Sequence, residues 1–288
     1  MHEWPLLIFT LLTQASVGLT LCAALVAFWL RKETAEQRFF VLCPALLCAC
    51  VLGGIGLIAS FAHLGYPLNA MNALRNIARS WLTREIVFAS LFLAVLGLAT
   101  LQALLIKRIQ PLALMVVGMS GVVLVFCMGK IYLSTSVVTW RHANNFVLFY
   151  GSVCILGALA ALFLIIPRLR NPAQSQAAHR LVYVAVGAVI FAVIARLLMQ
   201  PRYLDFLAAQ RVSDVITFPL QPLAAFDALA GMRLVSWSVM IAGAGLLMML
   251  LRQPVGRHGT LTNGWLLSGA SLLVLAEIMA RFVFYSIH

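Results

Sequence analysis

Long apolar segments alternate with short polar ones along the whole chain. Each apolar segment has the length that an α-helix needs to cross a bilayer, which is about 20 residues. The segments are predicted at residues 6–30, 39–62, 86–106, 111–128, 146–167, 181–199, 229–251 and 265–285. Because backbone polar groups inside a bilayer need partners within the protein, each segment is predicted to be helical. The pattern therefore predicts an all-α integral membrane protein with about eight transmembrane helices.

The order of these segments also predicts how the helices are grouped. Short connections favour antiparallel packing of neighbouring helices. We therefore expect two antiparallel four-helix bundles, one formed by residues 1–133 and the other by residues 134–288. The first bundle is expected to carry the functional site. An even number of spans places both termini on the same side of the membrane.

The composition agrees with this interpretation. Of the 288 residues, 63% are hydrophobic and only 10% are charged, whereas a soluble domain carries roughly 25% charged residues. The net charge of +12 comes from basic residues that are scattered over short connections. This distribution favours a role in membrane topology over nucleic-acid binding. Neither a Walker A motif nor a dinucleotide-binding fingerprint is present in the sequence.

The positions of the basic residues predict the orientation of the chain. The two sides of the membrane carry equal numbers of lysine and arginine residues, so the count alone does not predict the orientation. In the connections after the first, third, fifth and seventh spans, these residues directly adjoin helix ends, where the positive-inside rule is strongest. On the other side, several lie within or at the edges of spans: Arg84, Lys130, Arg196, Arg233 and Arg281. We therefore expect both termini and the longer connections to lie outside.

Metal chemistry within the chain is not expected. All six cysteines fall inside apolar spans, where thiols more often pack than bind metal: Cys22, Cys43, Cys48, Cys50, Cys127 and Cys154. A haem would need histidines deep inside helices as axial ligands. His63 is the one histidine near a span on a suitable face. No metal site and no haem are therefore predicted.

The connection between the second and third spans carries the clearest candidate chemistry. After Pro67, apolar residues recur at helical spacing and polar residues fill the opposite face, which predicts an amphipathic helix in the membrane interface. His63 stands where the second span ends, and Glu85 stands where the third begins. A tight re-entry would bring these two side chains together. The alternative is a solvated loop followed by a glutamate that suits the positive end of a helix dipole.

Two further groups of ionisable residues lie in or beside spans, where charges are costly and often functional. Glu277 and Arg281 are four positions apart, so we predict that they pair on one helix face in a structural role. Arg196, Arg233 and Lys130 lie near outer helix ends. They either snorkel, bind a protein surface or pair with the acidic residues Asp205, Asp214 and Asp227.

Several segments resemble the DmsC family, the membrane anchor subunits of bacterial dimethyl sulfoxide reductase and its close paralogues. The resemblance is carried by residues 2–10 and 58–65, and by Asn72, Leu74, Glu85, Glu277, Arg281, Phe284 and Tyr285. It extends from one end of the chain to the other, with a matching length and number of spans. It implies a multi-pass protein of the bacterial cytoplasmic (inner) membrane. Combined with the positions of the basic residues, it predicts that both termini are periplasmic.

The resemblance also implies a function. Such anchors oxidise menaquinol at the outer side and pass its electrons to a four-cluster Fe–S subunit. A molybdopterin subunit then reduces dimethyl sulfoxide or related S- and N-oxides. Family members carry no haem, and the Fe–S clusters and the molybdopterin belong to the partner subunits.

The resemblance assigns candidate roles to individual residues. His63 and Glu85 match a histidine and a glutamate that are linked to quinol binding in the family, and they are the candidate catalytic residues. Other quinol contacts are expected from the loop between them, at Gly65, Tyr66, Arg75 and Arg79. In this protein the basic residues of the loop come later than in its relatives.

A different class of function, that of a secondary transporter or permease, is the main competing hypothesis. Such a protein would show repeated halves and helices that are broken at mid-membrane. Clusters of closely spaced glycines lie at residues 53–56 and 243–245, but small residues also allow close helix packing. A haem-containing anchor and a purely structural anchor are two further hypotheses.

Overall fold

The computed structural model describes residues 4–63, 76–169, 171, 174–210, 219–252 and 264–287. Within these ranges, all regular structure is helical, and eight helices are long and apolar enough to cross a membrane. They are α1 (Trp4–Trp29), α2 (Ala35–His63), α4 (Trp81–Ile106), α5 (Pro111–Leu133), α6 (Asn144–Leu164), α7 (Ser175–Ala209), α9 (Ala230–Met248) and α10 (Gly264–Ser286). The shorter elements are η3 (Val138–Trp140), η4 (Ile166–Arg168), α8 (Pro222–Asp227) and η6 (Met249–Arg252). This arrangement confirms the predicted all-α membrane fold.

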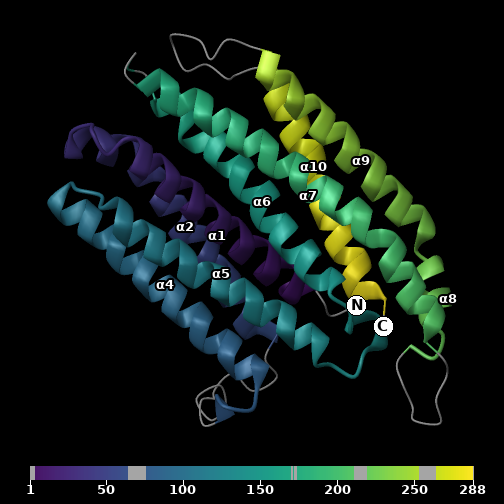
Figure 1. The fold of residues 1–288 in the computed structure, drawn as a ribbon. Coiled ribbons are helices and arrows are strands. Elements are labelled where there is room, and N and C mark those ends of the chain that lie inside the picture. The colour runs from purple at the N-terminus through teal and green to yellow at the C-terminus, as the bar shows by residue number, and fades with distance from the viewer. Residues whose placement is uncertain are drawn as a thin grey trace.

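The helices run side by side, with the two chain termini close together at one end of the molecule (Figure 1). Helix α1 lies centrally and packs against α2, α5 and α6. Helix α6 also packs against α7, and α9 packs against α10. The division into four-helix bundles of residues 1–133 and 134–288 stays a prediction.

Two glycines bring α1 and α6 into backbone contact. A Cβ atom on Gly18 would overlap the carbonyl oxygen of Val153 and lie 2.7 Å from the Cα of Gly157. A Cβ atom on Gly157 would in turn overlap the backbone of Gly18. Small residues at such crossings let membrane helices approach closely. This contact joins the first half of the chain to the second.

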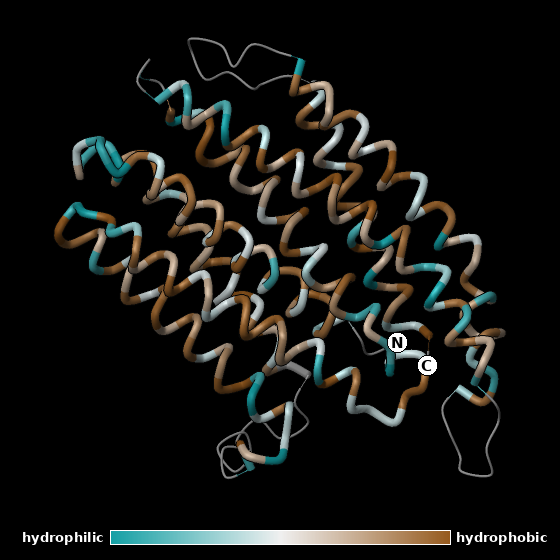
Figure 2. Tube along the Cα trace, in the orientation of Figure 1, coloured by the Kyte–Doolittle hydropathy of each residue, from teal (hydrophilic) through white to brown (hydrophobic). Residues whose placement is uncertain are grey.

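Hydrophobic residues cover the middle of the helices, and hydrophilic residues concentrate at helix ends and connections (Figure 2). Large apolar side chains are exposed on the outside of the molecule, for example Leu98, Leu105 and Phe191. Such a surface suits a lipid environment, because exposed apolar patches of this extent are rare on soluble proteins. The exposed apolar face therefore agrees with the eight predicted spans.

Helix α4 begins five residues earlier than the predicted third span, at Trp81. Ser80 caps it, because its hydroxyl accepts a hydrogen bond from the backbone N–H of Thr83 at 3.3 Å. A serine at this position satisfies one of the free N–H groups of the first turn. The early start places Glu85 in the second turn of the helix, one turn deeper than predicted.

Helix α7 continues through Pro201 to Ala209, so the predicted connection 200–228 is partly helical. The extension is amphipathic. Tyr203 and Leu207 are buried in a small cluster with Phe226, Val283 and Ile287. This packing against α8 and α10 explains why the helix does not end at the last residue of the apolar span.

Candidate functional site

Glu85 is a buried carboxylate at the end of the molecule where α2 ends and α4 begins. Its side chain is only 9% exposed. Within the described part of the chain, no cation or hydrogen-bond donor pairs with it. The buried hydroxyl groups of Tyr132 and Tyr285 lie in the neighbourhood of this carboxyl group. An ionisable group in this setting is a candidate for proton exchange.

His63 is the last residue of α2. Its side chain, and the loop residues Gly65, Tyr66 and Arg75, lie outside the residues that the structure describes. Most of the amphipathic helix that was predicted after Pro67 also lies outside the described residues. Trp81, which was predicted to belong to its apolar face, is the first residue of α4. Arg79 is exposed in the turn that precedes α4. The helix ends therefore place the backbone of His63 and the side chain of Glu85 at the same side of the molecule.

Two cations flank the indole ring of Trp81 beside this site. The guanidinium of Arg84 lies 4.1 Å from the ring centroid and donates hydrogen bonds to the carbonyl oxygens of Ile77, at 3.0 Å, and Ala78, at 2.6 Å. The ammonium of Lys130 lies 5.3 Å from the same ring. These cation–π contacts hold both charges at the helix ends.

An aromatic cluster extends from the site toward the centre of the molecule. The hydroxyl groups of Tyr132 and Tyr285 are hydrogen-bonded at 2.8 Å, and Tyr285 also bonds to Thr10 at 3.4 Å. The ring of Tyr132 makes edge contacts with those of Phe149 and Phe284. Polar side chains therefore continue inward from the Glu85 region across α5, α10 and α1.

A buried ionic cluster lies deeper in the membrane-spanning region. The carboxylate of Glu277 accepts a hydrogen bond from Arg196 at 2.6 Å and another from the hydroxyl of Ser152, also at 2.6 Å. Arg281 donates to Ser152 at 2.8 Å and to the amide oxygen of Gln14 at 2.7 Å. All five side chains are buried. The cluster joins α1, α6, α7 and α10.

The predicted pair of Glu277 with Arg281 is therefore wrong, because Glu277 pairs with Arg196. Spacing along one helix makes a pair possible, but α7 presents a guanidinium closer to the carboxylate. Arg281 instead turns toward Gln14 and over the ring of Phe149, 4.3 Å from its centroid. Gln14 and Ser152 were not identified from the sequence as members of this cluster. Their position as polar residues in the middle of apolar spans would have indicated a buried polar contact.

The ionic cluster holds more donors than acceptors. It contains two guanidinium groups and one carboxylate. Among the described residues, four of its buried nitrogens have no partner: Nε2 of Gln14, Nε of Arg196, and Nε and Nη1 of Arg281. The polar interior is thus positively charged.

Arg233, the last of the cations predicted near helix ends, has local partners. Arg233 forms a long ion pair with Asp227 at 3.8 Å and lies 3.3 Å above the ring of Phe226. Asp205 is exposed near the C-terminal end of α7. Asp214 lies outside the described residues. Among the residues with described side chains, no group of three or more His, Cys, Asp or Glu is placed to hold a metal ion.

Comparisons with known proteins identify a family. Residues 1–287 match the family model described as "DMSO reductase anchor subunit (DmsC)". The C chain of an anaerobic dimethyl sulfoxide reductase from Escherichia coli (strain K12) is 32% identical over 295 residues, covering 100% of this protein and 95% of the relative.

Two other relatives have similar names. The anaerobic dimethyl sulfoxide reductase chain YnfH of Escherichia coli (strain K12) is 29% identical, again over 100% of this protein and 95% of its own length. The C chain of an anaerobic dimethyl sulfoxide reductase from Haemophilus influenzae (strain ATCC 51907 / DSM 11121 / KW20 / Rd) is 30% identical over 68% of this protein and 69% of its own length. No solved structure matches the protein significantly. Because the family model covers nearly every residue and the helices have membrane-spanning length, this protein belongs to the DmsC family of DMSO reductase membrane anchor subunits.

Proposed function

We propose that this protein oxidises menaquinol at the helix ends near Glu85 and passes the electrons to an Fe–S partner subunit. The observation that carries the proposal is the burial of Glu85, beside the end of α2, without a described cation partner. A buried carboxylate of this kind is costly in a membrane protein and is a candidate for function by default. Membership of a family of reductase anchor subunits is compatible with quinol as the proposed substrate.

The chemistry requires two proton acceptors or one acceptor used twice. Oxidation of a quinol to a quinone releases two electrons and two protons, one from each hydroxyl group. A neutral imidazole at His63 suits the acceptance of a hydroxyl proton near neutral pH. Glu85 then passes protons to water at the outer side, while the electrons leave through the partner's nearest cluster. The anchor itself supplies binding and proton transfer.

The proposed partners are a four-cluster Fe–S subunit and a molybdopterin subunit that reduces dimethyl sulfoxide or a related S- or N-oxide. The names of the relatives, which are chains of anaerobic dimethyl sulfoxide reductases, support this assembly. We place the docking surface and both termini on the periplasmic side of the cytoplasmic membrane. The terminal acceptor is set by the molybdopterin subunit.

The proposal is tested with charge-altering variants in the assembled complex. His63→Arg and Glu85→Lys each place a fixed cation where a proton acceptor is needed. We expect both variants to lose reduction driven by a quinol and to retain reduction driven by a viologen dye, which delivers electrons directly to the soluble subunits. Glu33→Lys, a charge reversal in the turn between α1 and α2 at the opposite helix ends, is the matched control and retains both activities.

A conservative variant separates lost chemistry from failed assembly. Glu85→Gln keeps the size of the side chain and removes its ability to exchange a proton. We expect it to assemble normally and to lose quinol oxidation. Normal quinol turnover in His63→Arg and Glu85→Gln would overturn the proposal.

A further inference from the structure

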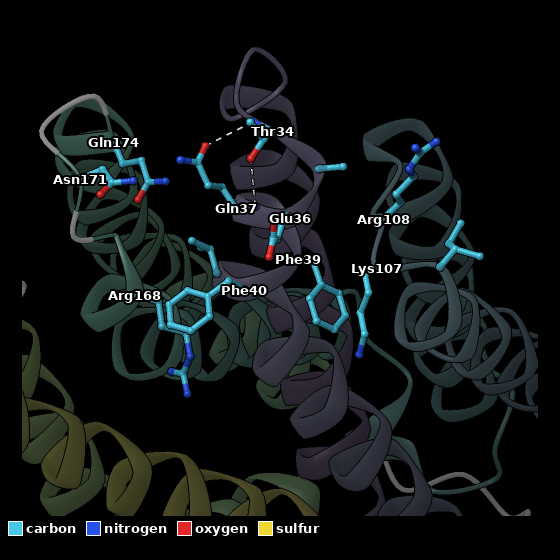
Figure 3. Close-up of a pocket in the computed structure, with 13 residues that line it drawn as sticks. Thr34, Glu36, Gln37, Phe39, Phe40, Lys107, Arg108, Arg168, Asn171 and Gln174 are labelled. Carbon is cyan, nitrogen blue, oxygen red and sulfur yellow. Dashed lines mark hydrogen bonds between the residues drawn. The ribbon is translucent and has the colours of Figure 1, made fainter.

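A polar cavity lies at the opposite ends of the helices from Glu85. It has a volume of about 910 Å³ and is bounded by the start of α2, the end of α4 and the region around η4 (Figure 3). Its lining carries three cations, Lys107, Arg108 and Arg168, and one acidic residue, Glu36. The cavity is therefore positively charged overall. No residue of the proposed quinol site contributes to it.

Two of these cations are held in place by their neighbours. Lys107 ends α4 in a left-handed conformation, with a φ of 52°, and its ammonium lies 4.7 Å from the ring centroid of Phe39. The guanidinium of Arg168 donates a hydrogen bond to the carbonyl oxygen of Leu164 at 2.7 Å. Their charges thus sit on either side of α2 at the mouth of the cavity (Figure 3).

Neutral polar groups complete the upper part of the cavity. Thr34 and Gln37 cap the start of α2 reciprocally, with two hydrogen bonds of 3.3 Å between side chains and backbone. The amide oxygen of Gln37 is used in this cap, which leaves its NH₂ group available as a donor. Asn171 and Gln174 line the wall of the cavity that lies across α2 from Lys107 and Arg108 (Figure 3).

An apolar cavity continues directly from the polar one. It has a volume of about 450 Å³ and shares Phe39, Phe40 and Arg168 with the polar cavity. Its other lining residues are Cys43, Pro44 and Pro167. Cys43 and Pro44 lie one helical turn further along α2, toward the middle of the span. A cationic mouth therefore opens into an apolar groove that runs into the membrane.

We propose that the two cavities form one binding site for an anionic phospholipid. The phosphodiester of the headgroup is bound at Arg168, where the two cavities meet, and Lys107 and Arg108 add to the positive potential of the mouth. One acyl chain lies against Phe40 and Pro44. Basic pockets between transmembrane helices are the expected recognition sites of anionic headgroups. A free phosphate ion would use the cations and leave the apolar groove empty, so the combination selects a lipid. This site is independent of the proposed quinol oxidation.

The test measures lipid bound to the full-length protein. The protein is purified in a mild detergent and titrated with phosphatidylglycerol or phosphatidylcholine, and bound lipid is counted by native mass spectrometry. Lys107→Gln/Arg168→Gln removes two cations of the site, and Arg31→Gln/Lys32→Gln removes two exposed cations at the same helix ends outside it. We expect the first double variant to bind phosphatidylglycerol roughly 30-fold more weakly and the second to bind it as the unchanged protein does.

Further arms identify the ligand class. Inorganic phosphate and glycerophosphoglycerol, which lacks acyl chains, are expected not to displace the bound lipid. Displacement by either would show a phosphate site and overturn the lipid assignment. Equal binding of phosphatidylcholine, or equal losses in both double variants, would overturn the proposed recognition. If Lys107→Gln/Arg168→Gln fails to fold, Arg108→Gln alone is expected to weaken binding about fivefold and decides the question in the same way.

Discussion

The hydroxyl oxygens of Tyr132 and Tyr285 lie 2.8 Å apart, although the residues are separated by 153 positions in the sequence. Both side chains are buried, so neither hydroxyl has water as an alternative partner. The hydrogen bond links the end of α5 to the end of α10. It also connects the surroundings of Glu85 with the buried ionic cluster, because Tyr285 and Arg281 lie one helical turn apart on α10.

The tyrosine pair is expected to contribute to stability as a unit. Tyr132→Phe removes one hydroxyl and leaves the other with a weaker partner, and we expect a loss of about 1 kcal/mol in the free energy of unfolding. The double variant with Tyr285→Phe should cost less than the sum of the two single changes. Unfolding of the purified protein in detergent measures both quantities. Tyr183→Phe, at a residue that is 60% exposed, is the control and is expected to be neutral.

Glu277 is expected to be essential for the fold. Glu277→Gln leaves Arg196 and Arg281 buried without a counter-charge, and breaking a buried ion pair in this way costs roughly 3–5 kcal/mol. We expect a large fall in the unfolding midpoint and in the amount of folded protein. Replacing Arg196 by Met in the same variant should restore part of the loss. Full stability of the single variant would show that the ionic cluster is not structural.

Gly18 is expected to tolerate no side chain. Gly18→Ala forces α1 away from α6, and overpacking of this kind costs about 1–3 kcal/mol. Gly187→Ala is the matched control, because a Cβ atom there meets nothing within 4 Å. Comparison of the two unfolding curves measures the effect of close helix contact. Equal curves would contradict the contact between the two backbones.

The complex is expected to contain no haem bound to this subunit. The prediction rests on the sequence, which offers no pair of histidines within spans as axial ligands. A pyridine haemochrome assay on the purified complex measures it. One haem per anchor subunit would refute the prediction.

The proposed docking surface lies at the Glu85 end of the molecule. We expect chemical crosslinks from the Fe–S subunit to residues 64–80 and 200–228, because these connections are longer than simple turns require. The connections at the opposite helix ends serve as the internal control. Crosslinks found mainly there would reverse the predicted orientation.

The number and type of the helices were predictable from the sequence, because a bilayer imposes length and apolarity on each span. The ends of the helices were less predictable. The cap at Ser80 and the packing of Tyr203 beyond Pro201 depend on local hydrogen bonds and tertiary contacts, which hydropathy does not report. The candidate site was likewise predictable in part. Glu85 was identifiable as an ionisable residue at a span, but its burial depends on neighbouring helices.

The partners inside the ionic cluster were not predictable from spacing. Glu277 and Arg281 share one helix face, yet each bonds to residues from other helices. Which helices face each other is decided by packing, including the contact at Gly18. A sequence pattern on one helix therefore identified the charged residues and assigned one of their partners wrongly.

The bond between Arg281 and Gln14 has a consequence for biosynthesis. Its residues are 267 positions apart and belong to the last and the first of the described helices. During translation, α1 enters the membrane while the ribosome has yet to make α10. Until α10 is inserted, the amide oxygen of Gln14 therefore either lacks its native hydrogen bond from Arg281 or is bound by a temporary donor. Closure of the polar interior is thus among the last events in the production of this protein, and a polypeptide truncated before α10 would expose an unfinished core to lipid and to membrane proteases.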